Sequence, residues 1–242
     1  MWRILLQSNA FLIAVFEFVI LIFSLCVHEC SHAWMASRLG DQTARMEGRI
    51  TLNPMYHVDP IGSLLFPAIM IFGPFIGFSM FSGMLVGWAK PTPVITRNFR
   101  KIVRDDNLTT LAGPVSNLLM VLVAVLVLIV TAKMIPDGRT VVLASFFATF
   151  NPSADFTPQP LVLACTVAIL INLSLFVFNL LPIPPLDGSR LVRNMLPYNA
   201  VQVYDRIPLW VSYLFMILVG GTVIRAFVDP ALELVIRALM RA

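Results

Sequence analysis

Residues 11–35 of the chain, FLIAVFEFVILIFSLCVHECSHAWM, combine a long apolar run with the polar pentad HECSH at positions 28–32. About 20 apolar residues in a helix cross a bilayer core of roughly 30 Å, and the run from about 10 to 35 has that length. No small-residue cleavage site follows it, so we expect a retained span and not a signal peptide. Ionisable residues inside a span are costly and mark functional sites, which singles out the pentad.

The composition excludes an ordinary soluble domain. Of the 242 residues, 58% are hydrophobic and only 12% are charged, and the mean hydropathy is +0.85. Globular domains carry about 25% charged residues. The net charge is +4, but the basic residues stand in short loops between apolar stretches, which indicates membrane orientation and not nucleic-acid binding. The three cysteines have no paired spacing, so we expect free thiols.

We therefore expect an all-α polytopic membrane protein with about five transmembrane helices plus a re-entrant hairpin or broken-helix segment. Four predicted spans cover about 10–35, 108–132, 161–181 and 208–227. The doubtful stretch, 61–88, contains several Gly and Pro residues, and irregular backbone at membrane depth survives only where protein or water satisfies it. The alternatives are a re-entrant segment over 61–96 and a plain kinked span. We expect one domain over 1–228 and an interfacial amphipathic tail over 229–242.

The pentad has the form H-E-x-x-H. On a helix, His28 and His32 share one face and can converge on one ion, and Glu29 can act as general base toward a water on that ion. A catalytic zinc needs a third protein ligand and an open fourth position. His57 and Asp187 are the candidates. Asp187 follows three prolines and precedes a glycine, although an Asp in that place could equally cap the next helix.

Other polar residues within or near the spans allow two interpretations each. Asn179 and Asn117 could contribute to the site or form interhelical hydrogen bonds. His57 could lie beside the ligands or the substrate, or could stabilise its Pro-flanked loop. Glu17 shares a helical stripe with His28, so it could line a water path or pair with a neighbouring helix.

The chain resembles the site-2 protease family of intramembrane zinc metalloproteases, peptidase family M50, from about Phe23 to Arg193. The resemblance rests on HECSHAWMASRLGDQTARMEGRITLNPMYHVDPIGS (28–63), GWAKPTPV (87–94), AGPVSN (112–117) and NLLPIPPLDGSRL (179–191). It implies one Zn²⁺ held by His28, His32 and Asp187, with Glu29 as catalytic base. It also implies that Asn179 holds the substrate backbone or the geometry of the site. No loop leaves room for a PDZ or CBS domain, so the similarity is to a compact member.

The implied ligand set has a consequence for topology. The three ligands must lie at one membrane level, so the stretch 61–88 must return to the side that it leaves. That side then holds eleven of the 17 basic residues, namely Arg38, Arg45, Arg49, Lys90, Arg97, Arg100, Lys101, Arg104, Arg190, Arg193 and Arg206. The positive-inside rule then predicts a multi-pass protein of the cell (inner) membrane, with the active site toward the cytoplasm.

The implied activity is zinc-dependent hydrolysis of peptide bonds in or near transmembrane segments, so the expected partners are membrane-protein substrates and the bilayer, without nucleic acid. Neither the substrate nor the oligomeric state follows from the sequence. The alternative is a non-proteolytic zinc-binding scaffold or a transporter on the same core. A transporter typically has paired broken helices, whereas this sequence has one broken stretch and no internal repeat.

Overall fold

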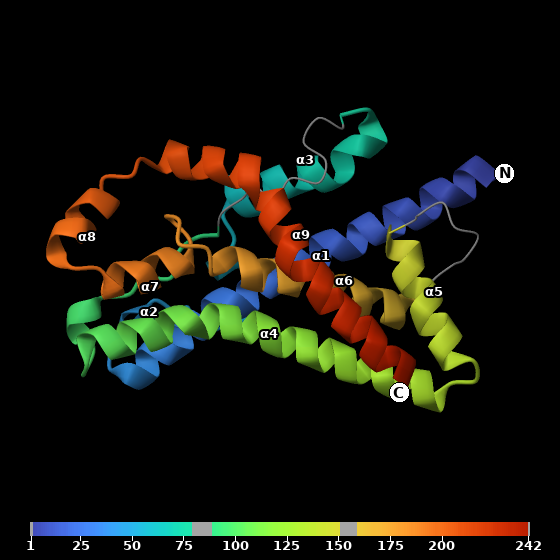
Figure 1. Cartoon of the computed structure of the whole chain (residues 1–242), viewed down its shortest axis with the longest axis horizontal. Helices are drawn as coiled ribbons and strands as arrows, with labels where there is room; N and C mark the ends of the chain where they lie inside the picture. Colours follow the sequence, from blue (N-terminus) through green and yellow to red (C-terminus); the bar gives the residue numbers. More distant parts are fainter. Residues whose placement is uncertain (1, 79–88, 151–158, 242) are drawn as a thin grey trace.

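The computed structural model describes residues 2–78, 89–150 and 159–241, and the regular structure in those ranges is helical (Figure 1). The longer helices are α1 (Trp2–Leu39), α4 (Ile102–Met134), α5 (Gly138–Phe150), α6 (Pro160–Asn179) and α9 (Leu209–Arg241). The shorter helices are α2 (Thr43–Met46), α3 (Phe66–Phe72), α7 (Asp187–Met195) and α8 (Tyr198–Tyr204). Single turns of other helix types are η1 (Pro54–Tyr56), η2 (Pro60–Leu65), η3 (Gly73–Ile76) and η4 (Thr96–Asn98).

Four helices of the described ranges are long and apolar enough to cross a membrane: Asn9–Leu39 within α1, and α4, α6 and α9. At about 1.5 Å per residue, even the 20 residues of α6 match a hydrocarbon core of roughly 30 Å. The prediction of an all-α polytopic membrane protein is confirmed. The fifth apolar stretch of the sequence contains the shorter helical run Pro60–Ile76.

Helices α1, α4 and α6 pack against one another and form the centre of the bundle. Between α4 and α6 the core is aliphatic, with Leu128 and Ile169 fully buried. Helix α5 adds Val142 to the same cluster, while Ile13 of α1 packs with Leu163 at the far end of α6. The apolar packing thus holds the three helices together away from the end where the polar pentad lies.

Helix α9 differs from the prediction of a span over 208–227 followed by a separate tail. It continues without interruption from Leu209 to Arg241, with Pro230 inside it. A proline removes only one backbone donor, and neighbouring helices can support the chain on both sides of it. Leu232 and Leu239 are buried in the core with α4 and α5, so the apolar side of the expected tail packs against protein.

One end of the bundle, on the left in Figure 1, gathers the end of α1, the start of α4, and α7 and α8. Asp41, just after α1, holds this end together. Its buried carboxylate accepts hydrogen bonds from Ile95 N (2.7 Å) and Asn98 Nδ2 (2.9 Å), and from the amide and hydroxyl of Thr43. Burial disfavours the ionised form, but these bonds outweigh it and hold the pKa of Asp41 below its usual value.

The segments that enter and leave the broken stretch also meet at this end. Lys90 N donates to the His57 carbonyl (2.9 Å), and Arg100 N donates to the Leu39 carbonyl (3.4 Å). The segment 38–60 therefore lies against 90–106. Within the predicted re-entrant segment 61–96, the described part runs through η2 and α3, which packs on α1, and resumes at residue 89. Residues 79–88 lie outside the described residues, and the re-entrant path remains a prediction.

Candidate metal centre

The two histidines of the pentad meet on one face of α1. Their Nε2 atoms are 3.1 Å apart, and His28 and His32 are only 4% and 7% exposed. The i, i+4 spacing stacks the two side chains one turn apart, and the helix provides the rigid base that a two-ligand site needs. A neutral imidazole can donate or accept at Nε2, so the character of this contact depends on the tautomers of the two rings.

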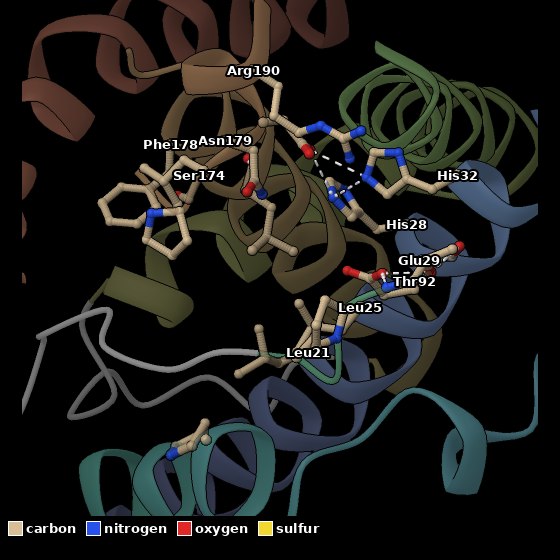
Figure 2. A pocket seen from close by; sticks show the side chains of 18 of the residues that line it. Leu21, Leu25, His28, Glu29, His32, Thr92, Ser174, Phe178, Asn179 and Arg190 are labelled. Carbon is tan, nitrogen blue, oxygen red and sulfur yellow. Dashed lines mark hydrogen bonds and ion pairs between the residues drawn. The ribbon is translucent and has the colours of Figure 1, made fainter. Parts of the chain in front are cut away.

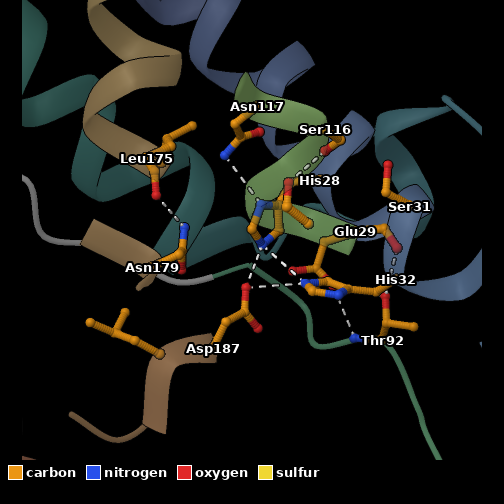
Figure 3. A network of polar contacts seen from close by, with 12 residues as sticks. His28, Glu29, Ser31, His32, Thr92, Ser116, Asn117, Leu175, Asn179 and Asp187 are labelled. Atoms are coloured by element: carbon orange, nitrogen blue, oxygen red, sulfur yellow. Dashed lines mark hydrogen bonds and ion pairs between the residues drawn. The ribbon is translucent and has the colours of Figure 1, made fainter. Parts of the chain in front are cut away.

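Asp187, the first residue of α7, lies against both imidazoles (Figure 3). Its Oδ2 lies 3.1 Å from His28 Nε2 and 3.3 Å from His32 Nε2. Leu186 occupies the position before the helix and makes no side-chain cap, and the Asp187 carboxylate faces the imidazoles.

The three facing atoms fit a divalent metal ion. Zinc with ligand bonds of about 2.0–2.2 Å in tetrahedral geometry separates its donor atoms by roughly 3.3–3.6 Å, slightly more than the 3.1–3.3 Å observed between these three atoms. Asp187 Oδ2 is buried without a hydrogen-bond donor. Two imidazoles and one carboxylate are also the donor types that catalytic zinc uses. The residues present therefore suit zinc.

Contacts behind the rings orient them. His32 Nδ1 lies 2.7 Å from the Thr109 carbonyl oxygen of α4. A carbonyl can only accept, so Nδ1 carries the proton and the Nε2 lone pair points to Asp187. His28 Nδ1 lies 3.2 Å from the amide nitrogen of Asn117, while Asn117 Oδ1 is buried without a partner. Turning the amide over would place Oδ1 as acceptor beside Nδ1 and leave His28 Nε2 free in the same way.

Gly113 makes room for the centre on α4. A Cβ atom at this position would lie 2.6 Å from both Nε2 and Cε1 of His28 and closer still to His32 Nε2. No side chain larger than hydrogen fits there while both rings keep their places. Gly188 has a comparable role beside Asp187, because a Cβ there would collide with the Leu180 carbonyl group.

Glu29 lies beside the pair and is held by Thr92. Oε2 of the carboxylate accepts from Thr92 Oγ1 (2.7 Å) and Thr92 N (3.1 Å). Suitable ligand atoms of His28, Glu29 and His32 all lie within 4.8 Å of one another. The carboxylate is thus close enough to act on a water molecule held at the three-ligand centre.

A cavity of about 450 Å³ opens at the centre (Figure 2). His28, Glu29, His32 and Asp187 lie on its wall. Much of the remaining wall is apolar and comes from four helices, with Leu21, Leu25, Met70, Ile71, Phe178 and Leu209 among its residues. Such a space suits an apolar chain with a reactive group at one end.

The other predicted site residues fall in different places. Asn179, the last residue of α6, lies on the cavity wall and donates through Nδ2 to the Leu175 carbonyl (3.0 Å). His57 is fully buried in its loop, with Nε2 2.8 Å from the Thr51 carbonyl, and it is not among the described cavity residues. Thr92 and Gly113 stand in the motifs GWAKPTPV and AGPVSN, and Gly113 is small enough for close helix packing, but nothing in local spacing points to the contacts of Thr92, Thr109 or Gly113 with the pentad.

The chain matches the family model described as peptidase family M50 over residues 16–220. It is 36% identical over 179 residues to YwhC of Bacillus subtilis, whose name describes a zinc metalloprotease, with 74% of this chain and 68% of YwhC covered. It is 32% and 33% identical to proteins named zinc metalloprotease Rip2 in Mycolicibacterium smegmatis and Mycobacterium tuberculosis. Those matches cover 68% of this chain and 51% of Rip2, so the chain spans about half their length. No solved structure matches.

Proposed function

Because this chain belongs to peptidase family M50, we propose that it is an intramembrane zinc endopeptidase that cleaves peptide bonds in or near transmembrane segments of other membrane proteins. It is an integral membrane metalloprotease that uses Zn²⁺. The finer proposal concerns the location of the cleaved bond and the residues that act on it. The observation that carries it is the position of the three facing donor atoms at the wall of an apolar cavity within a membrane-length bundle.

We assign His28, His32 and Asp187 as the ligands of one zinc ion per chain. When bound, zinc acts as a Lewis acid that polarises a carbonyl and lowers the pKa of a coordinated water to about 7. Asn117 and the Thr109 carbonyl orient the two imidazoles from behind. We assign to Asn179 the role of holding the substrate backbone or the geometry of the site, and its position on the cavity wall supports this assignment.

Glu29 acts as the general base. Its carboxylate accepts a proton from the attacking water as the water oxygen bonds to the carbonyl carbon of the substrate. The same carboxyl group then returns the proton to the amide nitrogen, the C–N bond breaks, and the second proton of the water passes to the leaving amine, so that a carboxylate and an ammonium group leave. The position of Glu29, next in sequence to His28 and on the cavity wall, supports this role.

The substrate has to be extended around the scissile bond, because the hydrogen bonds of a helix shield its peptide groups. The predicted re-entrant segment 61–96 is suited to receive an extended chain by strand addition. Its described return, 89–94, runs without regular helix along the cavity, with Ala89, Pro91 and Val94 on the wall.

Loop charge supports an orientation in the cell membrane with the active site toward the cytoplasm. The end of the bundle that holds the site also holds the hydrogen-bonded segments 38–60 and 90–106, which carry eight of the basic residues. The alternative functions, a non-proteolytic zinc scaffold or a transporter, have less support. A transporter typically has paired broken helices, whereas the described residues contain one broken stretch. A non-proteolytic scaffold does not need the general base proposed for Glu29.

The deciding experiment uses purified full-length protein in liposomes with a model single-span substrate. We expect zinc-dependent cleavage within or next to the span, about one zinc per chain, and at least 10²-fold slower cleavage by Glu29→Gln with zinc retained. Cleavage only in soluble domains of the substrate would refute the intramembrane assignment. Zinc binding without any cleavage would favour the scaffold.

A further inference from the structure

Thr92 makes a concentrated set of contacts with the proposed base. Both its amide and its hydroxyl reach Glu29 Oε2, at 3.1 and 2.7 Å. The hydroxyl also lies 3.1 Å from the Glu29 carbonyl oxygen. Because a hydroxyl has only one proton, it donates to the carboxylate oxygen, which is both closer and the stronger acceptor. Two donors thus converge on one carboxylate oxygen, and within the described ranges no protein donor reaches Oε1.

The segment that carries Thr92 is fixed independently of Glu29. On one side, Lys90 N donates to the His57 carbonyl (2.9 Å), and on the other, Ile95 N donates to the buried Asp41 carboxylate (2.7 Å). Pro91 and Pro93 flank Thr92 and restrict its backbone further. The segment therefore does not need Thr92 Oγ1 to keep its path past α1.

A long acidic side chain at a cavity wall has several rotamers, and only some of them point to the reacting water. Holding Oε2 from the fixed segment selects one rotamer and leaves Oε1 free. From these contacts we propose that Thr92 is a positioning residue, which orders the Glu29 carboxylate so that Oε1 takes the proton of the attacking water. This inference rests on the proposed function.

The role differs from ligand support and from substrate binding. Thr92 is on the cavity wall but has no contact with His28, His32 or Asp187 among its recorded hydrogen bonds, so its hydroxyl should not affect zinc. Its loss should lower kcat with little change in KM, because the base would spend less time in the working rotamer. A general base contributes about 10²–10⁴-fold, and we expect loss of its alignment to cost about tenfold.

The test compares Thr92→Val, which keeps the shape and the amide donor, with Thr92→Ser, which restores the hydroxyl. Thr96→Val is the matched control, because Thr96 is exposed on the same segment. Zinc content, thermal stability, kcat and KM are measured on the zinc-loaded full chain in liposomes. We expect the kcat of Thr92→Val to fall about tenfold, while its zinc content, thermal stability and KM stay unchanged. Thr92→Ser should recover most of the lost kcat, and Thr96→Val should match wild type.

Each other outcome has a defined meaning. A kcat of Thr92→Val within twofold of wild type overturns the proposal, as does a Thr92→Ser variant no better than Thr92→Val. Loss of zinc or of thermal stability in Thr92→Val overturns it in favour of a structural role. An inactive wild type contradicts the proposed function instead, whereas an active wild type with an inactive Glu29→Gln and a normal Thr92→Val contradicts only this inference.

Discussion

Arg190 Nη2 donates a 2.6 Å hydrogen bond to Asp106 Oδ1, and this contact ties α7 to α4. The second oxygen of Asp106 accepts from Asn194 Nδ2 (2.7 Å), so the buried carboxylate is engaged on both sides by α7. Arg190 stands one helical turn after Asp187. The ion pair therefore fixes the short helix that presents the proposed third ligand.

Replacement of Asp106 by Ala should weaken both the fold and the metal centre. Loss of two charge-assisted bonds with a buried partner should lower the free energy of unfolding by about 2–3 kcal/mol, and zinc affinity should fall about tenfold. Chelator competition and thermal unfolding measure these effects. The control is Arg193→Ala, which breaks an exposed pair with Asp205 and should cost at most about 1 kcal/mol with unchanged zinc affinity. Equal effects of the two variants would contradict the proposed clamp.

Each of the three proposed ligands should be required for stoichiometric zinc. His32→Ala and Asp187→Asn should leave less than a tenth of the wild-type zinc after dialysis against a weak chelator, as measured by elemental analysis. His57→Asn serves as the control, because His57 contacts the Thr51 carbonyl and lies outside the cluster. A full complement of zinc in His32→Ala, or its loss in His57→Asn, would show that the ligand set is wrong.

A single methyl group at Gly113 should abolish the centre. The added Cβ would overlap both imidazoles, so Gly113→Ala should neither bind zinc nor cleave substrate. Gly221→Ala is the matched control in another long helix, since a Cβ there meets no atom within 4 Å. That variant should keep its zinc and gain up to about 1 kcal/mol in stability from the better helix propensity of alanine. Normal zinc binding by Gly113→Ala would mean that the rings lie elsewhere.

Asn117 should matter for zinc affinity more than for stability. Asn117→Leu removes the acceptor proposed for the His28 Nδ1 proton, and loss of such an outer contact typically weakens metal binding 10–100-fold. Asn172→Leu is the comparison, because Asn172 makes an interhelical bond to Ser24 (2.9 Å). It should cost about 0.6 kcal/mol in stability and nothing in zinc affinity. Equal zinc affinities for the two variants would rule out an outer role for Asn117.

Single cysteines introduced at Met55 and at Arg100, in a chain whose three native cysteines are replaced, should react with an impermeant thiol reagent from one side only. Both positions are exposed, and both belong to the segments that hydrogen-bond to each other at the site end of the bundle. The loop charges predict that side to be the cytoplasmic one. Labelling from opposite sides would exclude a return of the stretch 61–88.

The sequence predicted the parts of this protein that depend on local pattern. Apolar length predicted the spans, and the pentad predicted that His28 and His32 share one face. The residue pattern left the third ligand open, whereas the family resemblance implied Asp187, whose carboxylate does face both imidazoles. The support around them could not be predicted. The contact of Thr92 with Glu29 spans 63 positions and follows no helical period. Gly113 is decided by the depth of a helix–helix contact, which only the packed bundle defines.

The dispersal of the centre along the chain has a consequence for its biosynthesis. The histidine pair lies in the first span, the residue that holds the base in a later loop, and the carboxylate only after α6. At elongation rates of about 5–20 residues per second, roughly 8–30 s pass between synthesis of the histidines and of Asp187. If Asp187 is the third zinc ligand as proposed, a chain truncated before it should lack the complete centre and should not cleave a substrate.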